Sequence, residues 1–255
     1  MRWLIAQRWE QLLFAHWAVE PEELRRLLPR AVEPDVHDGA AWLSIVAFLM
    51  VGTRPPAARA CWRGLGAIPE LNVRTYVRVA NVRGVWFLSL DTSSPLFVAI
   101  GRALYGLRYR LARMTALAEG DVIHYLSAPA GAAFAAAYAP SGPPVPARAG
   151  SLEHFLVERY RLFSVRHGRL VTARVAHEPW ALQPADAEIA VNRMAPAGLA
   201  FRGAPLLHFS RSVSALIAAP VPVRQAPASA TTAEESFRSP AHMARRACVT
   251  GGTAG

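Results

Sequence analysis

The stretch Glu70-Leu71-Asn72-Val73-Arg74-Thr75-Tyr76-Val77-Arg78-Val79 alternates strictly between two sets of side chains. A period of two residues is typical of a β-strand, because successive side chains point to opposite faces of the sheet. One face would carry the mainly apolar set, and the other would carry Glu70, Asn72, Arg74, Tyr76 and Arg78. We expect this polar face to point either into solvent or into the interior of a closed barrel, where it would line a wet cavity.

Strand-like segments dominate the rest of the chain as well. Apolar alternation between turn residues predicts further strands at 9–19, 40–51, 85–91, 109–118, 122–127, 159–166, 169–177 and 205–219. Short helices are predicted at 20–28 and 95–105, and after Ser151, whose hydroxyl is a suitable helix cap. The sequence therefore predicts an α+β fold that is predominantly antiparallel β, in the form of a barrel or cone.

The composition points to one folded domain and a tail. The chain has 255 residues, of which 53% are hydrophobic, and this suffices for one large core. Beyond residue 224 the sequence becomes rich in Ala, Pro, Ser and Thr with no apolar period. We therefore predict a single domain over 1–224 and a disordered tail over 225–255.

The cysteines and the apolar runs indicate the compartment. Cys61 and Cys248 form neither a disulfide framework nor a zinc-binding pattern. No apolar stretch has the length of a signal peptide core or of a membrane span. We expect a cytoplasmic protein that does not associate with a membrane.

All 28 basic residues are arginine, and the formal net charge is +10. Ten arginines and only two acids, Glu70 and Asp91, lie between residues 51 and 118. This excess indicates an anionic partner, either a small carboxylate or phosphate or a nucleic acid, unless the arginines simply coat a solvated surface. The absence of a recognised basic-aromatic motif argues against nucleic acid.

Several segments in the same order resemble the YqjF-like family of bacterial proteins. They are Phe14-Ala15-His16-Trp17, Asp38-Gly39-Ala40-Ala41-Trp42, the stretch 70–77, the stretch 151–160 and His177-Glu178-Pro179-Trp180. The resemblance covers roughly residues 9–219. That family resembles acetoacetate decarboxylase in fold, so the resemblance implies a cone-shaped β-barrel with a few short helices and a buried site.

The decarboxylase motif is only partly kept. It reads Gly-Arg-Glu, two residues, Gly, one residue, Pro-Lys-Lys, and this chain matches it at Gly101, Arg102 and Gly106. Tyr109 stands in place of the lysine that forms the Schiff base, and the chain contains no lysine at all. A phenol cannot form an imine, so the resemblance implies the cavity without the decarboxylase chemistry.

The candidate site follows from the polar strand face and the partial motif. We predict that Arg74 grips a carboxylate and that Tyr76, Asn72, Arg102 and His177 also contact the ligand. Tyr109 would be a general acid with its pKa lowered by Arg102 or Arg74, and Glu70, which the resemblance aligns with an acid of the decarboxylase site, would be the base.

The sequence leaves three hypotheses about function open. The first is a barrel that binds a small anionic or carbonyl ligand, and the second is a lyase or isomerase that acts on a keto or oxyacid substrate. The third is an arginine-rich nucleic-acid-binding protein. No cofactor is expected, and His16, His177 and His208 lack metal-binding spacing, which favours structural roles. A homo-oligomer is compatible with each reading.

Overall fold

The computed structural model describes residues 2–58 and 66–223. Their elements are β1 (Trp3–Val19), α1 (Pro21–Arg25), β2 (Glu33–Pro34), β3 (Ala41–Arg54), β4 (Ile68–Val79), β5 (Val82–Thr92), α2 (Pro95–Tyr105), β6 (Tyr109–Glu119), β7 (Val122–Pro129), β8 (Phe134–Pro140), β9 (Val145–Pro146), α3 (Leu152–Val157), β10 (Arg161–Arg166), β11 (Arg169–His177), β12 (Ala181–Asn192), β13 (Leu206–Ala218) and β14 (Val221–Pro222). The tail predicted for 225–255 lies outside the described residues, as do Cys61 and Cys248.

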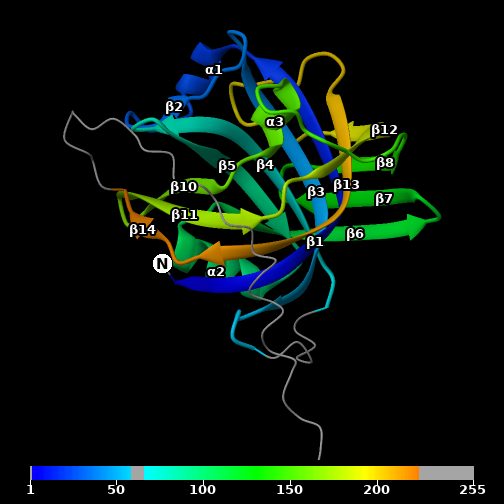
Figure 1. The fold of residues 1–255 in the computed structure, drawn as a ribbon, viewed down its shortest axis with the longest axis horizontal. Coiled ribbons are helices and arrows are strands. Elements are labelled where there is room, and N and C mark those ends of the chain that lie inside the picture. The colour runs from blue at the N-terminus through cyan, green and yellow to red at the C-terminus, as the bar shows by residue number, and fades with distance from the viewer. Residues whose placement is uncertain (1, 59–65, 224–255) are drawn as a thin grey trace, which may run out of the picture.

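The longer strands close into two rings that share a wall. The first ring runs through β5, β6, β7, β8, β12, β13, β1, β3 and β4, and the pairing of β4 with β5 closes it. The second ring runs from β5 through β10 and β11 to β13 and returns along the same β1, β3 and β4. Most pairings are antiparallel, but β5 pairs in parallel with β6 and with β10. The predicted, predominantly antiparallel β-barrel with a few short helices is confirmed, and its two parallel pairings, both made by β5, make it a mixed barrel (Figure 1).

Strand β4 belongs to the shared wall and is buried on both faces. Leu71, Val73 and Val77 pack in one core with residues of β7 and β8. Tyr76 packs on the opposite side in a second core with Phe155. The alternation at residues 70–77 therefore separates two interiors, and the polar side chains from Glu70 to Tyr76 point into the second ring. Arg78, near the end of the strand, is partly exposed, with a side-chain exposure of 41%.

Helix α2 fills one end of the second ring. Phe97, Gly101 and Tyr105 are its buried residues, and the helix ends at Gly106, whose φ of 66° is left-handed. A side chain at Gly106 would also come within 2.4 Å of the carbonyl oxygen of Val165, so both the turn and the packing require glycine. The sharp turn lets the chain enter β6 at Tyr109.

Two strands of the first ring, β8 and β12, were not predicted. β8 reads Phe-Ala-Ala-Ala-Tyr-Ala-Pro, and alanine has low strand propensity. It is held as a strand by pairing with β7 and β12, which are distant partners that local periodicity does not reveal. Boundaries also differ, because β1 begins at Trp3 rather than at residue 9, and α1 ends at Arg25 rather than at residue 28.

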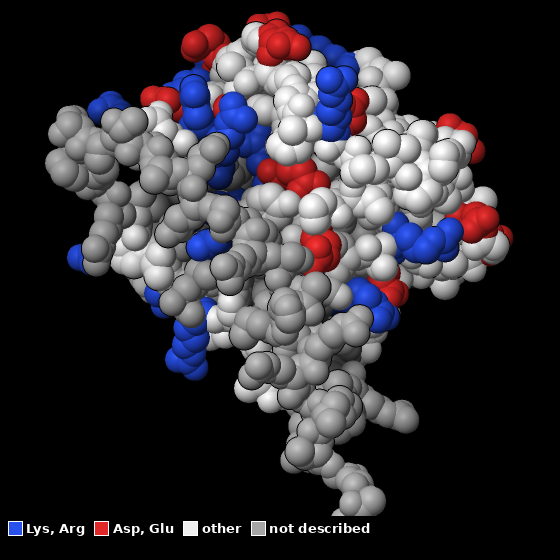
Figure 2. Space-filling model, in the orientation of Figure 1, with Lys and Arg blue, Asp and Glu red and all other residues white. Residues whose placement is uncertain are grey.

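Part of the positive charge is neutralised by a buried acid. Asp35, which is 1% exposed, contacts Arg159 at 2.7 Å, Arg83 at 3.4 Å and Arg78 at 3.7 Å. Figure 2 shows basic side chains gathered at the upper left of the face in view, with acidic side chains on the same face. Among the described residues, no helix has the length and apolar character needed to cross a membrane.

Candidate functional site

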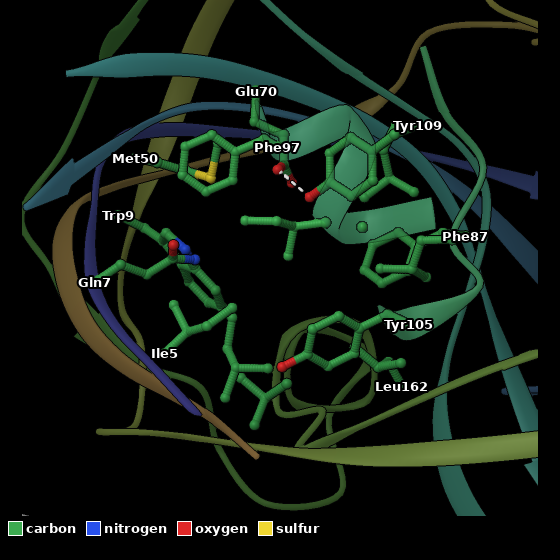
Figure 3. Close-up of a pocket in the computed structure, with 16 residues that line it drawn as sticks. Ile5, Gln7, Trp9, Met50, Glu70, Phe87, Phe97, Tyr105, Tyr109 and Leu162 are labelled. Atoms are coloured by element: carbon green, nitrogen blue, oxygen red, sulfur yellow. Dashed lines mark hydrogen bonds between the residues drawn. The ribbon is translucent and has the colours of Figure 1, made fainter. Parts of the chain in front are cut away.

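The interior of the second ring contains a pocket beside α2. Its volume is about 90 Å³, which is room for several water molecules or one small organic molecule. Every strand of the second ring contributes at least one residue to the lining (Figure 3). Most of the lining is apolar, and its polar members are Gln7, Glu70, Tyr105 and Tyr109, with the indole of Trp9.

Glu70 and Tyr109 form a hydrogen-bonded pair in the wall of this pocket. The Tyr109 hydroxyl donates to Oε2 of Glu70 at 2.6 Å, and Glu70 is only 5% exposed. Figure 3 shows both side chains on the same side of the cavity, across from Tyr105. The sequence predicted that Tyr109 reaches the chamber beside Glu70, and the structure brings these two residues together.

Gly101 of α2 makes room for the Tyr109 ring. A Cβ atom at this position would lie 2.2 Å from Cδ2 and 2.4 Å from Cε2 of Tyr109. Because real contacts are never this short, only glycine permits the ring to lie against the helix. The glycine that matches the decarboxylase motif thus has a direct packing role in placing Tyr109.

Burial controls the protonation of the pair. Desolvation raises the pKa of Glu70 to about 7, although the hydrogen bonds from Tyr109 and Asn72 act in the opposite direction. Burial, and then the neighbouring Glu70 carboxyl, raises the pKa of Tyr109 well above its ordinary value. At neutral pH the tyrosine therefore keeps its proton, and Glu70 is poised between its two protonation states.

The prediction that Arg102 or Arg74 lowers the pKa of Tyr109 is wrong. Arg102 is exposed, and its Nε donates to the backbone oxygen of Tyr109 at 2.8 Å rather than to the phenol. Arg74 is four residues from Glu70 along β4, a separation of roughly 13 Å in a strand. Neither guanidinium is part of the described pocket lining, so burial rather than a nearby positive charge determines the pKa of Tyr109.

None of the remaining predicted ligand-binding residues lines this pocket. Arg74 and Tyr76 lie on the same face of β4 but at the α3 end, where Nη2 of Arg74 donates to the backbone oxygen of Leu156 at 3.4 Å. Asn72 lies between the two ends, and its Oδ1 is buried with no partner among the described residues.

His177 is packed among aromatic side chains. Its Nδ1 lies 2.7 Å from the backbone oxygen of Glu178. The ring is stacked on Tyr160 at 4.6 Å and tilted against Trp180 at 4.9 Å. Within the described ranges, no group of three or more His, Cys, Asp or Glu side chains could hold a metal ion.

Sequence reasoning missed several residues of the pocket. Gln7 and Trp9 come from the first part of β1, and Tyr105 comes from the end of α2. The Tyr105 hydroxyl donates to the backbone oxygen of Ala218, and Oε1 of Gln7 accepts from Thr53. Tyr105 could have been inferred from its helical spacing with Gly101, whereas nothing local to residues 5–9 indicates a cavity.

By fold, the protein is an acetoacetate-decarboxylase-like barrel. It superimposes on acetoacetate decarboxylase from Legionella pneumophila with a TM-score of 0.61 at 16% identity, covering 86% of this chain and 87% of that one. The enduracididine biosynthesis enzyme MppR, in a structure with pyruvate, gives 0.64 at 13% identity over 87% and 91% of the two chains. An acetoacetate decarboxylase-like enzyme from Sphingomonas wittichii RW1 gives 0.60 at 15% identity over 89% and 95%.

More specifically, the chain belongs to the DUF2071 family, described as an uncharacterised conserved protein, whose model matches residues 6–214. A relative from Bacillus subtilis strain 168, the uncharacterised protein YqjF, is 38% identical over 225 residues, which is 84% of this chain and 90% of YqjF. The resemblance to the YqjF-like family is therefore confirmed.

Proposed function

We propose that the protein binds a small, uncharged carbonyl compound in the pocket beside α2. The observation that carries this proposal is the Glu70–Tyr109 pair, which places hydrogen-bonding groups in the wall of an otherwise largely apolar cavity. Ligand sites commonly combine an apolar lining with a few polar groups that fix orientation. MppR, which shares this fold, was solved with pyruvate, and the keto group of pyruvate is a carbonyl of the proposed class, although its carboxylate is not.

The charge of the pocket favours an uncharged ligand over an anionic one. The described lining contains one acid, Glu70, and no arginine. An anion in this pocket would lose its hydration without gaining a cationic partner, which is a large cost in an apolar interior. Of the two ligand classes predicted from the sequence, the carbonyl class therefore fits this pocket better.

The protonated form of Glu70 is the form suited to a carbonyl oxygen. When Glu70 carries a proton, the pair has one more O–H group than its own hydrogen bond requires, and that group can donate to the ligand. When Glu70 is ionised, the Tyr109 hydrogen is committed to the carboxylate. Affinity should therefore be highest at low pH and fall as the pH rises through the pKa of Glu70, which is about 7.

Titration with cyclohexanone at pH 6 and pH 8 tests this proposal. Binding can be followed through the fluorescence of Trp9, which lines the pocket, with Trp9→Phe used to assign the signal. We expect tighter binding at pH 6, a preference for cyclohexanone over pyruvate, and weaker binding in Tyr109→Phe. Glu70→Gln should bind without pH dependence, because an amide donates at both pH values.

Glu188→Gln is a matched control, because Glu188 is exposed on β12 and far from the pocket. It should bind cyclohexanone as the wild type does. Absence of saturable binding to any uncharged ketone of this size, or equal affinity of wild type and Tyr109→Phe at both pH values, would contradict the proposal.

The same pair also supports a second candidate, a proton transfer at the carbon next to the carbonyl. A general base works best when its pKa lies near the operating pH, and the pKa of Glu70 is about 7. As Glu70 takes up the α-proton, its carboxylate charge is neutralised and the Tyr109 hydrogen becomes available to the developing enolate oxygen. Exchange of the α-hydrogens of cyclohexanone in D₂O measures this activity, and it should be lost in Glu70→Gln. Binding without any protein-dependent exchange would leave the protein a receptor only.

A further inference from the structure

A second polar cluster lies in the same ring, at the end covered by α3. His16 of β1, Ser44 of β3 and Arg74 of β4 are direct neighbours across the sheet, since His16 pairs with Ser44 and Ser44 pairs with Arg74. Their side chains share the interior face with Tyr76 and with His208 of β13. Ser44 is small, and it separates the two longer side chains of His16 and Arg74.

The hydrogen bonds in this cluster depend on the tautomer of His16. The hydroxyls of Tyr76 and Ser44 are 2.8 Å apart, and His16 Nδ1 lies 2.7 Å from the Ser44 oxygen and 3.3 Å from the Tyr76 oxygen. Both hydroxyl hydrogens find an acceptor among the described residues only if Nδ1 accepts one of them. A proton on Nδ1 would leave one buried hydroxyl hydrogen without an acceptor. A proton on Nε2 instead satisfies both hydroxyls and leaves the ring N–H as a buried donor that a ligand could satisfy.

Several buried atoms of the cluster have no partner within the described residues. They are Nε2 of His16, Nε of Arg74 and Nδ1 of His208. His16 is 1% exposed and His208 is 8% exposed, so bulk water does not serve them. Buried polar atoms are nearly always hydrogen-bonded, which indicates that an absent group completes this cluster.

The unpartnered donors come together around one aromatic ring. The guanidinium carbon of Arg74 lies 5.7 Å from the centre of the Phe14 ring, and the His16 ring is stacked on Phe14 at 6.1 Å. The rings of His16 and His208 are 5.8 Å apart. The Arg74 guanidinium, which carries a permanent positive charge, and the His16 ring thus lie beside the same phenylalanine ring.

We propose that this cluster is a second binding site, which takes a small carboxylate between Arg74, His16 and His208. A carboxylate supplies the acceptor oxygens and the negative charge that the unpartnered donors require. Burial, and then the Arg74 charge, holds the pKa of His16 well below its usual value, so the ring is neutral and serves as an N–H donor. The site is independent of the proposed ketone function at Glu70.

An aromatic wall separates the two sites. Trp9 lines the Glu70 pocket and stacks on Trp180 at 6.1 Å, and Trp180 contacts Phe14 at 5.0 Å. Phe14 in turn lies beside Arg74 and His16. A ligand in one site should therefore not touch the polar groups of the other.

Acetate and acetamide are suitable probes, because they have the same shape and differ in charge. We expect acetate to shift the ¹⁵N and ¹H resonances of His16 and Arg74 in a saturable manner, whereas acetamide does not. Arg74→Gln should weaken acetate binding about tenfold or more, as expected for the loss of a charge-assisted hydrogen bond. Glu70→Gln should bind acetate within about twofold of the wild type, since it alters only the other pocket.

A second measurement does not depend on any variant. Long-range ¹H–¹⁵N correlation spectra of the wild-type protein should show His16 as the Nε2–H tautomer.

If Arg74→Gln does not fold, Arg74→Lys keeps the charge but lacks the Nε–H group and should still bind acetate more weakly. A His16 ring protonated at Nδ1, unsaturable or absent acetate shifts, or equal responses to acetate and acetamide would overturn the proposal and indicate a cluster filled by water only.

Discussion

The Tyr109 hydroxyl donates to the Glu70 carboxyl at 2.6 Å inside the second ring, and the two residues arrive there from different elements. β4 brings Glu70, and the tight turn after α2 brings Tyr109. The hydrogen bond stabilises the ionised carboxylate, whereas burial opposes ionisation. Because both effects act on the pKa of Glu70, removing one of them alone should shift that pKa in a predictable direction.

Replacing Tyr109 with Phe should move the pKa of Glu70 above its value of about 7. The substitution removes the hydrogen bond that lowers this pKa and leaves the burial that raises it. The pH titration of the side-chain carboxyl carbon of Glu70 by ¹³C NMR measures the change. A pKa that falls toward 4.5 would show that water enters the pocket in place of the hydroxyl.

Glu70 should make the stability of the protein depend on pH in a specific window. The pKa is about 7 in the folded chain against an ordinary value of 4.5, so the folded state binds the proton more tightly. The contribution is fully present below about pH 4.5 and is lost as the pH rises to about 7. The loss amounts to at most about 3 kcal/mol, since each pKa unit is worth about 1.4 kcal/mol.

Urea unfolding of wild type and Glu70→Gln across pH 4 to 8 isolates this contribution. The difference in unfolding free energy between them should change through the window, whereas the difference for exposed Glu188→Gln should stay flat. Parallel curves for wild type and Glu70→Gln would show that Glu70 titrates normally in the folded protein.

Gly101→Ala should displace Tyr109 without touching any polar group. The new methyl carbon would meet the Tyr109 ring at 2.2 Å, so the ring must move away from α2. We expect cyclohexanone affinity to fall about tenfold, an effect of the size of one lost hydrogen bond. Gly66→Ala is the control, because a Cβ there meets no atom within 4 Å. Equal affinity in the two variants would show that the position of Tyr109 does not matter for binding.

Asp35→Asn should destabilise the fold by about 3–5 kcal/mol, the cost of leaving a buried charge without its partner. Arg159, which has a side-chain exposure of 4%, would lose its contact at 2.7 Å, and Arg78 and Arg83 would lose theirs. Asp121→Asn is the matched control, because its partner Arg211 is exposed and such pairs contribute at most about 1 kcal/mol. Denaturant unfolding at pH 7 compares the two variants.

The sequence predicts those parts of the structure that local alternation encodes. β4 was predicted from its period of two, and the helix predicted over 95–105 has the same bounds as α2. β8 was not predicted, because its alanine-rich segment becomes a strand only through distant pairing.

The candidate site was also only partly predictable from the sequence. Glu70 and Tyr109 were assigned to one site with the help of the fold resemblance, and their hydroxyl and carboxyl groups are in contact. Arg74 was assigned to the same pocket because periodicity gives the face of a strand but not the position along it. A strand rises about 3.3 Å per residue, so residues that share a face can serve different sites. Gln7 was not predicted, because the cavity that it lines forms only where β1 lies opposite α2 in the folded chain.

The wall shared by the two rings should leave a distinctive mutational profile. Along the outer hairpin of β6 and β7, every second position faces solvent, as Leu117 does at 62% exposure, and should accept polar substitutions. Along residues 70–77 of β4, odd and even positions both face an interior, so a saturation scan should show no alternation in tolerance. In this barrel, a strand whose sequence resembles an amphipathic surface ribbon has no solvent-facing side on which it could vary freely.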